Sequence, residues 1–164
     1  MLSKEQIAQR IAQEIRDGEY IYLGIGIPSL IANYLPERLQ VVFQAENGLL
    51  GIGTYPKPDN LDPDLVNAGK ETISMVKGSS LFDSAEAFAM IRGGHMDLSI
   101  LGALEVSENG DISNWKISAN LIKGVGGALD LVASNAKLYV AMHHCHKDGS
   151  SKLLSHCTMP ITGI

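Results

Sequence analysis

Residues 20–28 read Tyr20-Ile21-Tyr22-Leu23-Gly24-Ile25-Gly26-Ile27-Pro28. A short apolar run that ends at closely spaced glycines is typical of a buried strand followed by a tight turn. Proline is favoured at the first position of a helix because the N–H that it lacks needs no partner there. The stretch therefore predicts a strand over residues 20–23, a glycine turn, and a helix from residue 28 to about residue 34.

The residues before this stretch predict a helix over residues 4–17. Ser3 and Gln6 have the spacing of a capping box, and Ile7, Ile11 and Ile15 recur on one helical face. Gly18 follows as a C-terminal stop signal.

The residues after it continue the alternation of strands and helices. Asp83 and Glu86 form a second capping-box pattern, which predicts a helix to about Arg92, ended by Gly93 and Gly94. Further strands are expected over residues 41–44, 98–101, 137–142 and 152–154. This order predicts an α/β fold with an open, mixed, largely parallel sheet flanked by helices, whose ligands bind at the carboxyl ends of the strands. The length of 164 residues fits one domain, residues 1–164.

Two connecting segments have distinct patterns. Residues 55–63 contain three prolines in nine positions, which predicts a long surface excursion without regular structure. Residues 104–106 precede the polar turn 107–111, and its Asn-Gly pair predicts a hairpin.

Composition excludes several classes of function. The formal net charge is −5, and the 13 Lys and Arg residues are scattered, whereas a nucleic-acid surface needs them clustered. No stretch has enough uncharged apolar residues to span a bilayer, and the polar N-terminal helix has no signal core. Two cysteines make no disulfide framework. We expect a cytoplasmic protein with no nucleic-acid or membrane partner.

The strongest candidate for chemistry is Glu46, a carboxylate that follows an apolar strand and precedes Gly48, Gly51 and Gly53. A carboxylate presented in this way can act as a covalent nucleophile. The chain repeats the tripeptide Glu-Asn-Gly at Glu108, where polar residues and a predicted hairpin surround it. There an exposed turn is the better interpretation, whereas the apolar residues that follow Glu46 indicate a buried site.

The glycine-rich loops match no nucleotide-binding motif. Gly24 and Gly26 lack the third glycine of the dinucleotide fingerprint, and residues 123–128 lack the Lys-Ser or Lys-Thr ending of a phosphate loop. Both loops are better suited to bringing backbone N–H groups to an anion or a developing oxyanion. Tight packing and plain flexibility are the alternatives.

His143, His144, Cys145 and His146 are ligand types that zinc prefers. Successive side chains on a strand alternate in direction, so three neighbours cannot converge on one ion. We predict no metal site there and expect structural histidines around a buried cysteine.

Several of these stretches, taken together, resemble one family in order and spacing. They are Gly24-Ile25-Gly26-Ile27-Pro28, Gln44-Ala45-Glu46-Asn47-Gly48, Arg92-Gly93-Gly94-His95-Met96-Asp97, Asn114-Trp115 and Lys123-Gly124-Val125-Gly126-Gly127-Ala128. The chain is similar to the beta subunit of a class I CoA-transferase of the 3-oxoacid type, nearest the bacterial acetate or butyrate:acetoacetate enzymes.

The resemblance implies a function and a set of site residues. By position Glu46 would attack an acyl-CoA thioester and carry CoA as a glutamyl thioester in a ping-pong exchange, with CoA and acyl-CoA as substrates and no cofactor. Backbone donors and CoA contacts would come from Gly24, Gly26, Asn47, Gly126, Gly127 and Ala128. His95 and Lys123 are further candidates for contacts, and the alternative for His95 is that it caps the chain as it turns into the next strand. The partner would be an alpha subunit, in an α2β2 assembly.

The chain departs from the family pattern at three places, and two of them, Ala45 and the end at Ile164, motivate a second hypothesis. Ala45 stands where the family commonly has Ser, and Ser118-Ala119-Asn120 stands where it usually has Pro-Gly-Lys. The chain also stops at Ile164, before the final strands of the family's beta subunits, as a C-terminally shortened form would. The alternative is a non-catalytic assembly partner or remnant of the same fold. Sugar-phosphate isomerase chemistry on a related fold has no support beyond the α/β pattern and the glycine turns.

Overall fold

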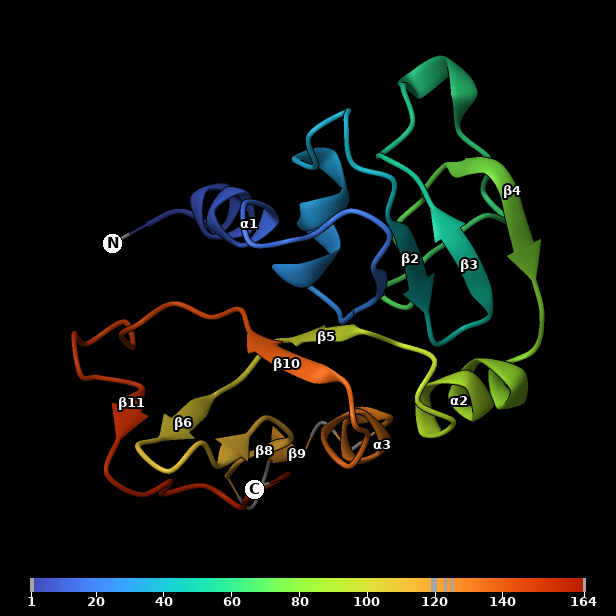
Figure 1. Cartoon of the computed structure of the whole chain (residues 1–164). Coiled ribbons are helices and arrows are strands. Elements are labelled where there is room, and N and C mark those ends of the chain that lie inside the picture. The colour runs from blue at the N-terminus through green and yellow to red at the C-terminus, as the bar shows by residue number, and fades with distance from the viewer. Residues whose placement is uncertain (1, 119–120, 123, 125, 164) are drawn as a thin grey trace.

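The computed structural model describes residues 2–118, 121–122, 124 and 126–163 of the chain. Its centre is a six-stranded sheet in the order β10-β5-β1-β2-β3-β4 (Figure 1). Four strands are parallel, namely β1 (Tyr20–Leu23), β2 (Val42–Ala45), β5 (Leu98–Leu101) and β10 (Lys137–Val140). Two strands at one edge are antiparallel, β3 (Leu49–Ile52) and β4 (Met75–Leu81). The predicted α/β class with a mixed, largely parallel sheet is confirmed.

Helices cover both faces of this sheet (Figure 1). One face carries α1 (Lys4–Ala12) and the 3₁₀ helix η1 (Pro28–Asn33), which contact each other. The other carries α2 (Ser84–Arg92) and α3 (Ala128–Val132), which also contact each other.

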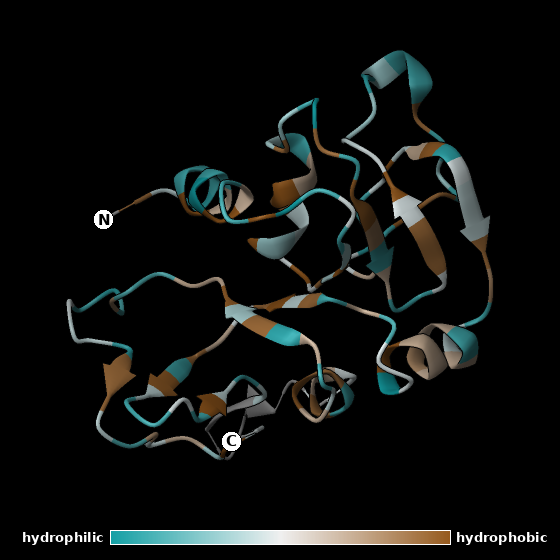
Figure 2. Cartoon of the chain, viewed as in Figure 1, coloured by the Kyte–Doolittle hydropathy of each residue, from teal (hydrophilic) through white to brown (hydrophobic). Residues whose placement is uncertain are grey.

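The alternation of side chains along β1 separates two cores. Ile21 and Leu23 belong to the core beneath α1 and η1, whereas Tyr22 packs with Ile91 and Leu131 of α2 and α3. Successive side chains of a strand point to opposite faces, so an apolar run is buried on both sides. Figure 2 shows apolar residues along the central strands and a largely hydrophilic α1.

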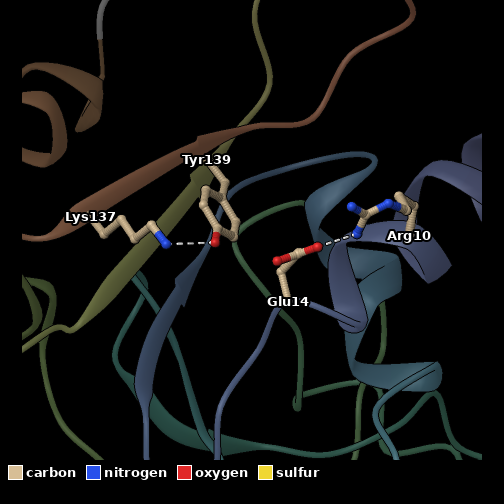
Figure 3. Close-up of polar contacts among 4 residues, drawn as sticks. All are labelled: Arg10, Glu14, Lys137 and Tyr139. Carbon is tan, nitrogen blue, oxygen red and sulfur yellow. Dashed lines mark hydrogen bonds and ion pairs between the residues drawn. The ribbon is translucent and has the colours of Figure 1, made fainter.

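The N-terminal helix is shorter than predicted, since α1 ends at Ala12 and not at residue 17. Its capping box is present, with Ser3 and Gln6 exchanging both hydrogen bonds. After the end of α1, Gly18 donates its N–H to the carbonyl of Gln40. This tertiary contact turns the chain toward β1. An ion pair between Arg10 and Glu14 spans the helix end (Figure 3).

Other predicted boundaries shift by a few residues. The helix expected after Pro28 is a 3₁₀ helix, because its turns close by i to i−3 bonds such as Tyr34 N–H to Ile31 O. The strands expected over residues 41–44, 137–142 and 152–154 are Val42–Ala45, Lys137–Val140 and Leu153–Leu154 (β11). None of the helices in the described part of the chain is long and apolar enough to cross a bilayer.

The proline-rich excursion contains one short 3₁₀ turn, η2 (Pro58–Asn60), and is tied back to the glycine turn. Oε2 of Glu71 accepts hydrogen bonds from Ser29, Tyr55 and Asn67 at 2.8–2.9 Å. The edge strand β4 that follows was missed because its largely exposed residues, Met75–Leu81, show no apolar alternation.

The C-terminal third forms two small sheets. The predicted hairpin is confirmed as β6 (Glu105–Ser107) and β7 (Ile112–Ser113), one residue later than expected, with β11 parallel to β6. A second hairpin pairs β8 (Lys116–Ser118) with β9 (Leu121–Ile122).

Candidate active site

A cavity of about 520 Å³ lies at the carboxyl ends of β1, β2 and β5. Its walls are the end of β1 with its turn, the end of β5 and the chain after it at residues 101–104, Asn114, and the loop that leads into α3. Glu46 is the acidic residue among the described lining residues. The position agrees with the rule that ligands of open α/β sheets bind beyond the carboxyl ends of the strands.

Glu46 occupies the turn of a β-hairpin. The antiparallel strands β2 and β3 flank it, and the turn closes through the Gly48 N–H, which donates to Ala45 O at 3.1 Å. Gly48 has φ +108° and lies against the backbone of Phe82, so a side chain does not fit there. The hairpin was not predicted around Glu46, although Asn-Gly between apolar runs is its usual signal.

Tyr22 reaches the Glu46 carboxylate from the neighbouring strand. Its hydroxyl donates a hydrogen bond of 2.8 Å to Oε2 of Glu46. The Tyr22 side chain is buried, and burial raises the pKa of its phenol, with further contributions from the charge of Glu46 and the hydrogen bond to it. Tyr22 therefore keeps its proton and remains a donor.

The loop before α3 approaches the same carboxylate. A Cβ atom on Gly127 would lie 2.8 Å from Oε2 of Glu46 and 2.5 Å from the ring of Phe88. Only glycine allows this backbone so close to the carboxylate. Gly126 and Ala128 line the same wall, whereas Lys123 and Val125 lie outside the described residues.

The remaining predicted loop residues have other environments. Gly24 lines the cavity, but its N–H donates to Ile100 O at 2.9 Å. Gly26 does not line it, and its carbonyl accepts a hydrogen bond from Ser29. Asn47 is exposed and donates to Val66 O at 2.7 Å, which ties the Glu46 turn to the chain that follows the proline-rich excursion. The cavity thus gathers Gly24, Gly126, Gly127 and Ala128 around Glu46, without Gly26 or Asn47.

Two polar cavity residues were missed by the sequence analysis, Tyr22 and Asn114. Alternation along β1 places Tyr22 on the face opposite Ile21 and Leu23, and this period is the signal that could have found it. Asn114 is fixed by a long-range contact, since Thr162 donates its hydroxyl to Oδ1 of Asn114 at 2.7 Å. No local sequence pattern predicts such a long-range contact.

The other side chains considered for chemistry lie apart from the cavity. His95 follows α2 and is exposed. His143 is half-buried, with Nδ1 lacking a partner among the described residues, and His144 is exposed. In the described ranges, no three His, Cys, Asp or Glu side chains are arranged to hold a metal ion.

A family model described as Coenzyme A transferase matches residues 4–164. The chain belongs to the coenzyme A transferase family. The predicted enzyme class and the resemblance to CoA-transferase beta subunits are confirmed by relatives that match nearly the whole chain.

Curated members of the CoA-transferase family are similar over this length. The chain is 56% identical over 160 residues to one subunit of the succinyl-CoA:3-ketoacid coenzyme A transferase of Helicobacter pylori, a match that covers 98% of this chain and 77% of that protein. It is 49% identical over 162 residues to the beta subunit of the acetate CoA-transferase of Escherichia coli K12, covering 99% and 74%.

Solved structures share the fold at low identity. An acyl-CoA transferase apoenzyme from Escherichia coli O157:H7 superposes with a TM-score of 0.72 at 16% identity, over 99% of this chain and 32% of that one. A variant of the decarboxylase AibA/AibB superposes with a TM-score of 0.62 at 17% identity, over 98% and 66%. Because one fold carries both reactions, the fold alone does not select the chemistry.

Two of the departures from the family pattern are a side chain that faces away from the cavity and a segment partly outside the described residues. The side chain of Ala45 is 1% exposed and belongs to the core beneath α1, on the face of the sheet away from Tyr22. Its change from Ser therefore removes no group from the cavity wall. Ser118 ends β8, and Ala119 and Asn120 lie outside the described residues.

Proposed function

We propose that this chain is the subunit of a CoA-transferase that carries the nucleophile, and that Glu46 is that nucleophile. The enzyme moves CoA between a short-chain acyl-CoA or 3-oxoacyl-CoA and a carboxylic acid of the acetate, butyrate or acetoacetate type. The observation that carries this proposal is the half-buried Glu46 carboxylate in the cavity, in contact with a buried phenol and beside a glycine backbone.

The surroundings of Glu46 suit a carboxylate nucleophile. Such a group must be ionised yet poorly hydrated, and the leucines and glycines of the wall limit its contact with water. The carboxylate attacks the thioester carbon, and the C–S electron pair leaves with CoA to give an acyl glutamyl anhydride. The CoA thiolate then attacks the glutamyl carbonyl, and the first acid departs as a carboxylate. The acceptor acid reverses these steps and leaves as the new acyl-CoA.

Backbone N–H groups near Glu46 stabilise the negative charge that develops on the carbonyl oxygens during the reaction. Gly126, Gly127 and Ala128 line the cavity beside the carboxylate, and we assign them this role. Gly24 contributes by its small size, because its N–H is already bonded within the sheet. Gly26 and Asn47 contribute indirectly, because their hydrogen bonds hold the loops around the site in place.

The partner is an alpha subunit, in an α2β2 assembly. The relatives are named as individual subunits of their enzymes, and the Escherichia coli relative as the beta subunit, which supports a second chain. The phosphates of CoA need cationic partners. None of the described residues that line the cavity is Lys, Arg or His. The alpha subunit therefore supplies much of the positive charge. A cytoplasmic location stays a prediction.

The test is to trap the covalent intermediate on the assembled enzyme. The chain is mixed with its alpha subunit and acetoacetyl-CoA, and the Glu46 peptide is examined by mass spectrometry for a CoA adduct or its borohydride-reduced form. We expect the adduct on Glu46 and none on the Glu46→Gln variant, which should also lose CoA transfer.

Glu108→Gln is the matched control, because it makes the same change in the second, exposed Glu-Asn-Gly turn. It should leave transfer and the adduct unchanged. An assembled complex that forms no adduct would support the non-catalytic alternative, and transfer by Glu46→Gln would remove Glu46 from the nucleophile role.

A further inference from the structure

The hydroxyl of Tyr22 touches the carboxylate at which the proposed chemistry takes place. It donates to Oε2 of Glu46 at 2.8 Å, and no other side chain in the described part of the chain donates a hydrogen bond to this carboxylate. Under the proposed function we assign the attack on the substrate to the other oxygen, Oε1.

The position of Tyr22 is rigid. It lies in β1 between two parallel neighbours, with Gln44 of β2 and Ser99 of β5 as its register partners. The side chain is 2% exposed and packs with Ile91 and Leu131. A donor that is fixed in advance on a central strand needs no rearrangement when charge develops on its acceptor.

The proton of Tyr22 stays on the phenol. Burial is the largest cause that raises its pKa, followed by the charge of Glu46 and the hydrogen bond. The phenol therefore acts as a hydrogen-bond donor and not as a general acid or base.

We infer that Tyr22 is a catalytic residue whose hydroxyl holds Oε2 of Glu46 and stabilises the negative charge on that oxygen each time the glutamyl carbonyl is attacked. This inference rests on the proposed role of Glu46 as the nucleophile. It adds a donor from β1 to the backbone donors of the loop before α3.

The electron balance places the charge on Oε2 twice in each cycle. Oε1 of Glu46 bonds to the acyl carbon and CoA leaves as a thiolate. When the thiolate attacks Cδ of Glu46, the carbonyl electron pair moves onto Oε2. The pair returns as the Cδ–Oε1 bond breaks, and the first acid leaves as a carboxylate that carries Oε1. Attack by the acceptor carboxylate on the glutamyl thioester repeats the charge on Oε2. Tyr22 donates to this oxygen throughout and transfers no proton.

The test is a Tyr22→Phe variant in complex with the alpha subunit. It keeps the ring and its packing and removes only the hydroxyl. Loss of one oxyanion donor lowers kcat by about 100-fold to 1,000-fold. We expect that loss of kcat with a KM for acyl-CoA within about twofold of the parent, because Tyr22 contacts Glu46 and because Oε2, which shares the charge of the resting carboxylate, carries the full oxyanion charge when the glutamyl carbonyl is attacked. The rate of adduct formation on Glu46 should fall by the same factor.

Tyr139→Phe is the matched control. Tyr139 lies on β10 of the same sheet, and its hydroxyl accepts a hydrogen bond from Lys137 Nζ at 2.8 Å (Figure 3). It does not line the cavity. This variant loses a phenol hydroxyl outside the site and should keep the parent kcat.

A second measurement is independent of how well the Phe variant folds. Fluorotyrosine at position 22 makes the phenol more acidic while it keeps the ring and the hydroxyl. The rate of adduct formation should change with the acidity of the phenol.

Unchanged kcat in Tyr22→Phe, or a raised KM with unchanged kcat, would overturn the inference, as would fluorotyrosine variants that all react at the parent rate. These outcomes are distinct from failure of the proposed function. That failure would appear in the parent complex, as no adduct on Glu46, or as transfer by Glu46→Gln.

Discussion

The two Glu-Asn-Gly turns place the same residue type in two different environments. Glu46 and Glu108 both sit in the turn of an antiparallel hairpin, and both are followed by a glycine with positive φ. Glu108 is exposed, whereas Glu46 is half-buried and accepts a hydrogen bond from Tyr22. The difference lies in what packs against the turn and not in the turn itself.

The first prediction concerns the close approach of Gly127 to Glu46. Gly127 has φ −75°, which any residue adopts, so an alanine there acts through its methyl group alone. That methyl would press on Glu46 Oε2 and the Phe88 ring. We expect Gly127→Ala to lower the free energy of unfolding by about 1–3 kcal/mol, measured by denaturant titration, and to reduce kcat more than tenfold.

Gly102→Ala is the stability control for that change. It adds a methyl in the same cavity wall, where the nearest atoms, Ala141 O and Ile25 O, lie 3.9 and 4.0 Å away. Its unfolding free energy should stay within about 0.5 kcal/mol of the parent. Equal losses in the two variants would contradict the contact argument at Gly127.

The second prediction concerns the buried carboxylate of Glu105, which is 3% exposed. It accepts hydrogen bonds from the N–H groups of Thr158 and Met159 and from the Thr158 hydroxyl. Burial raises the pKa of this carboxyl group. The hydrogen bonds and the charge of His146 together lower the pKa by more, so the net shift is downward. The stability it contributes is therefore full above its unfolded pKa of about 4.3 and is lost as the pH falls through the lower, folded pKa.

We expect Glu105→Gln to lower the free energy of unfolding at pH 7 by about 1.5–3 kcal/mol, since hydrogen bonds to a charged group are lost. The difference in unfolding free energy between this variant and the parent should disappear as the pH is lowered below about 4. Denaturant titrations at pH 7 and below about pH 4 measure this difference. Glu108→Gln, an exposed change on the same hairpin, should have little effect, and a Glu105 gap that did not depend on pH would argue against the charged acceptor.

At the scale of elements, the β2–β3 hairpin that carries Glu46 depends on the glycine at its end. Gly48 has φ +108°, and a Cβ there would overlap the carbonyl of Phe82, whose N–H donates to Gly48 O. Gly110, in the β6–β7 hairpin, has φ +93° with nothing within 4 Å of a Cβ. The two glycines thus share a conformation and differ in packing.

The third prediction follows from this pair. Gly110→Ala should cost about 1–2 kcal/mol of unfolding free energy through backbone strain alone. Gly48→Ala should cost about 1–3 kcal/mol more, because it adds a clash with Phe82. Thermal or denaturant unfolding of both variants measures the difference. An equal cost would show that the backbone at Phe82, just after β4, shifts without loss of stability.

At the scale of the whole molecule, the charge of this chain bears on where the phosphates of CoA would bind under the proposed function. The formal net charge is −5, and the described lining of the cavity carries no cation. The fourth prediction is that this chain alone transfers CoA at less than a hundredth of the rate of its mixture with the alpha subunit. Steady-state assays of each chain and of the mixture, with size-exclusion chromatography of the same samples, measure this. Full activity of the isolated chain would contradict it.

Much of the fold followed from local patterns. The strand at Tyr20–Leu23, the helix after Asp83 and the hairpin before Ile112 were each predicted from periodicity or turn chemistry. The errors lie where distant contacts define an element. The first helix ends early at Ala12 because the chain turns to meet Gln40, and the exposed edge strand β4 exists through its pairing with β3.

The sequence by itself determined the α/β class, the strand that ends at Leu23 with the glycine turn after it, and Glu46 as the candidate nucleophile. These depend on residues close together in the chain. The tertiary structure alone decided what surrounds that carboxylate. The donor on Tyr22 lies 24 residues away on a neighbouring strand, and Gly127 arrives from a loop still farther along the chain. Parallel pairing brings distant strand ends to one edge of the sheet, and no local pattern records which side chains will meet there.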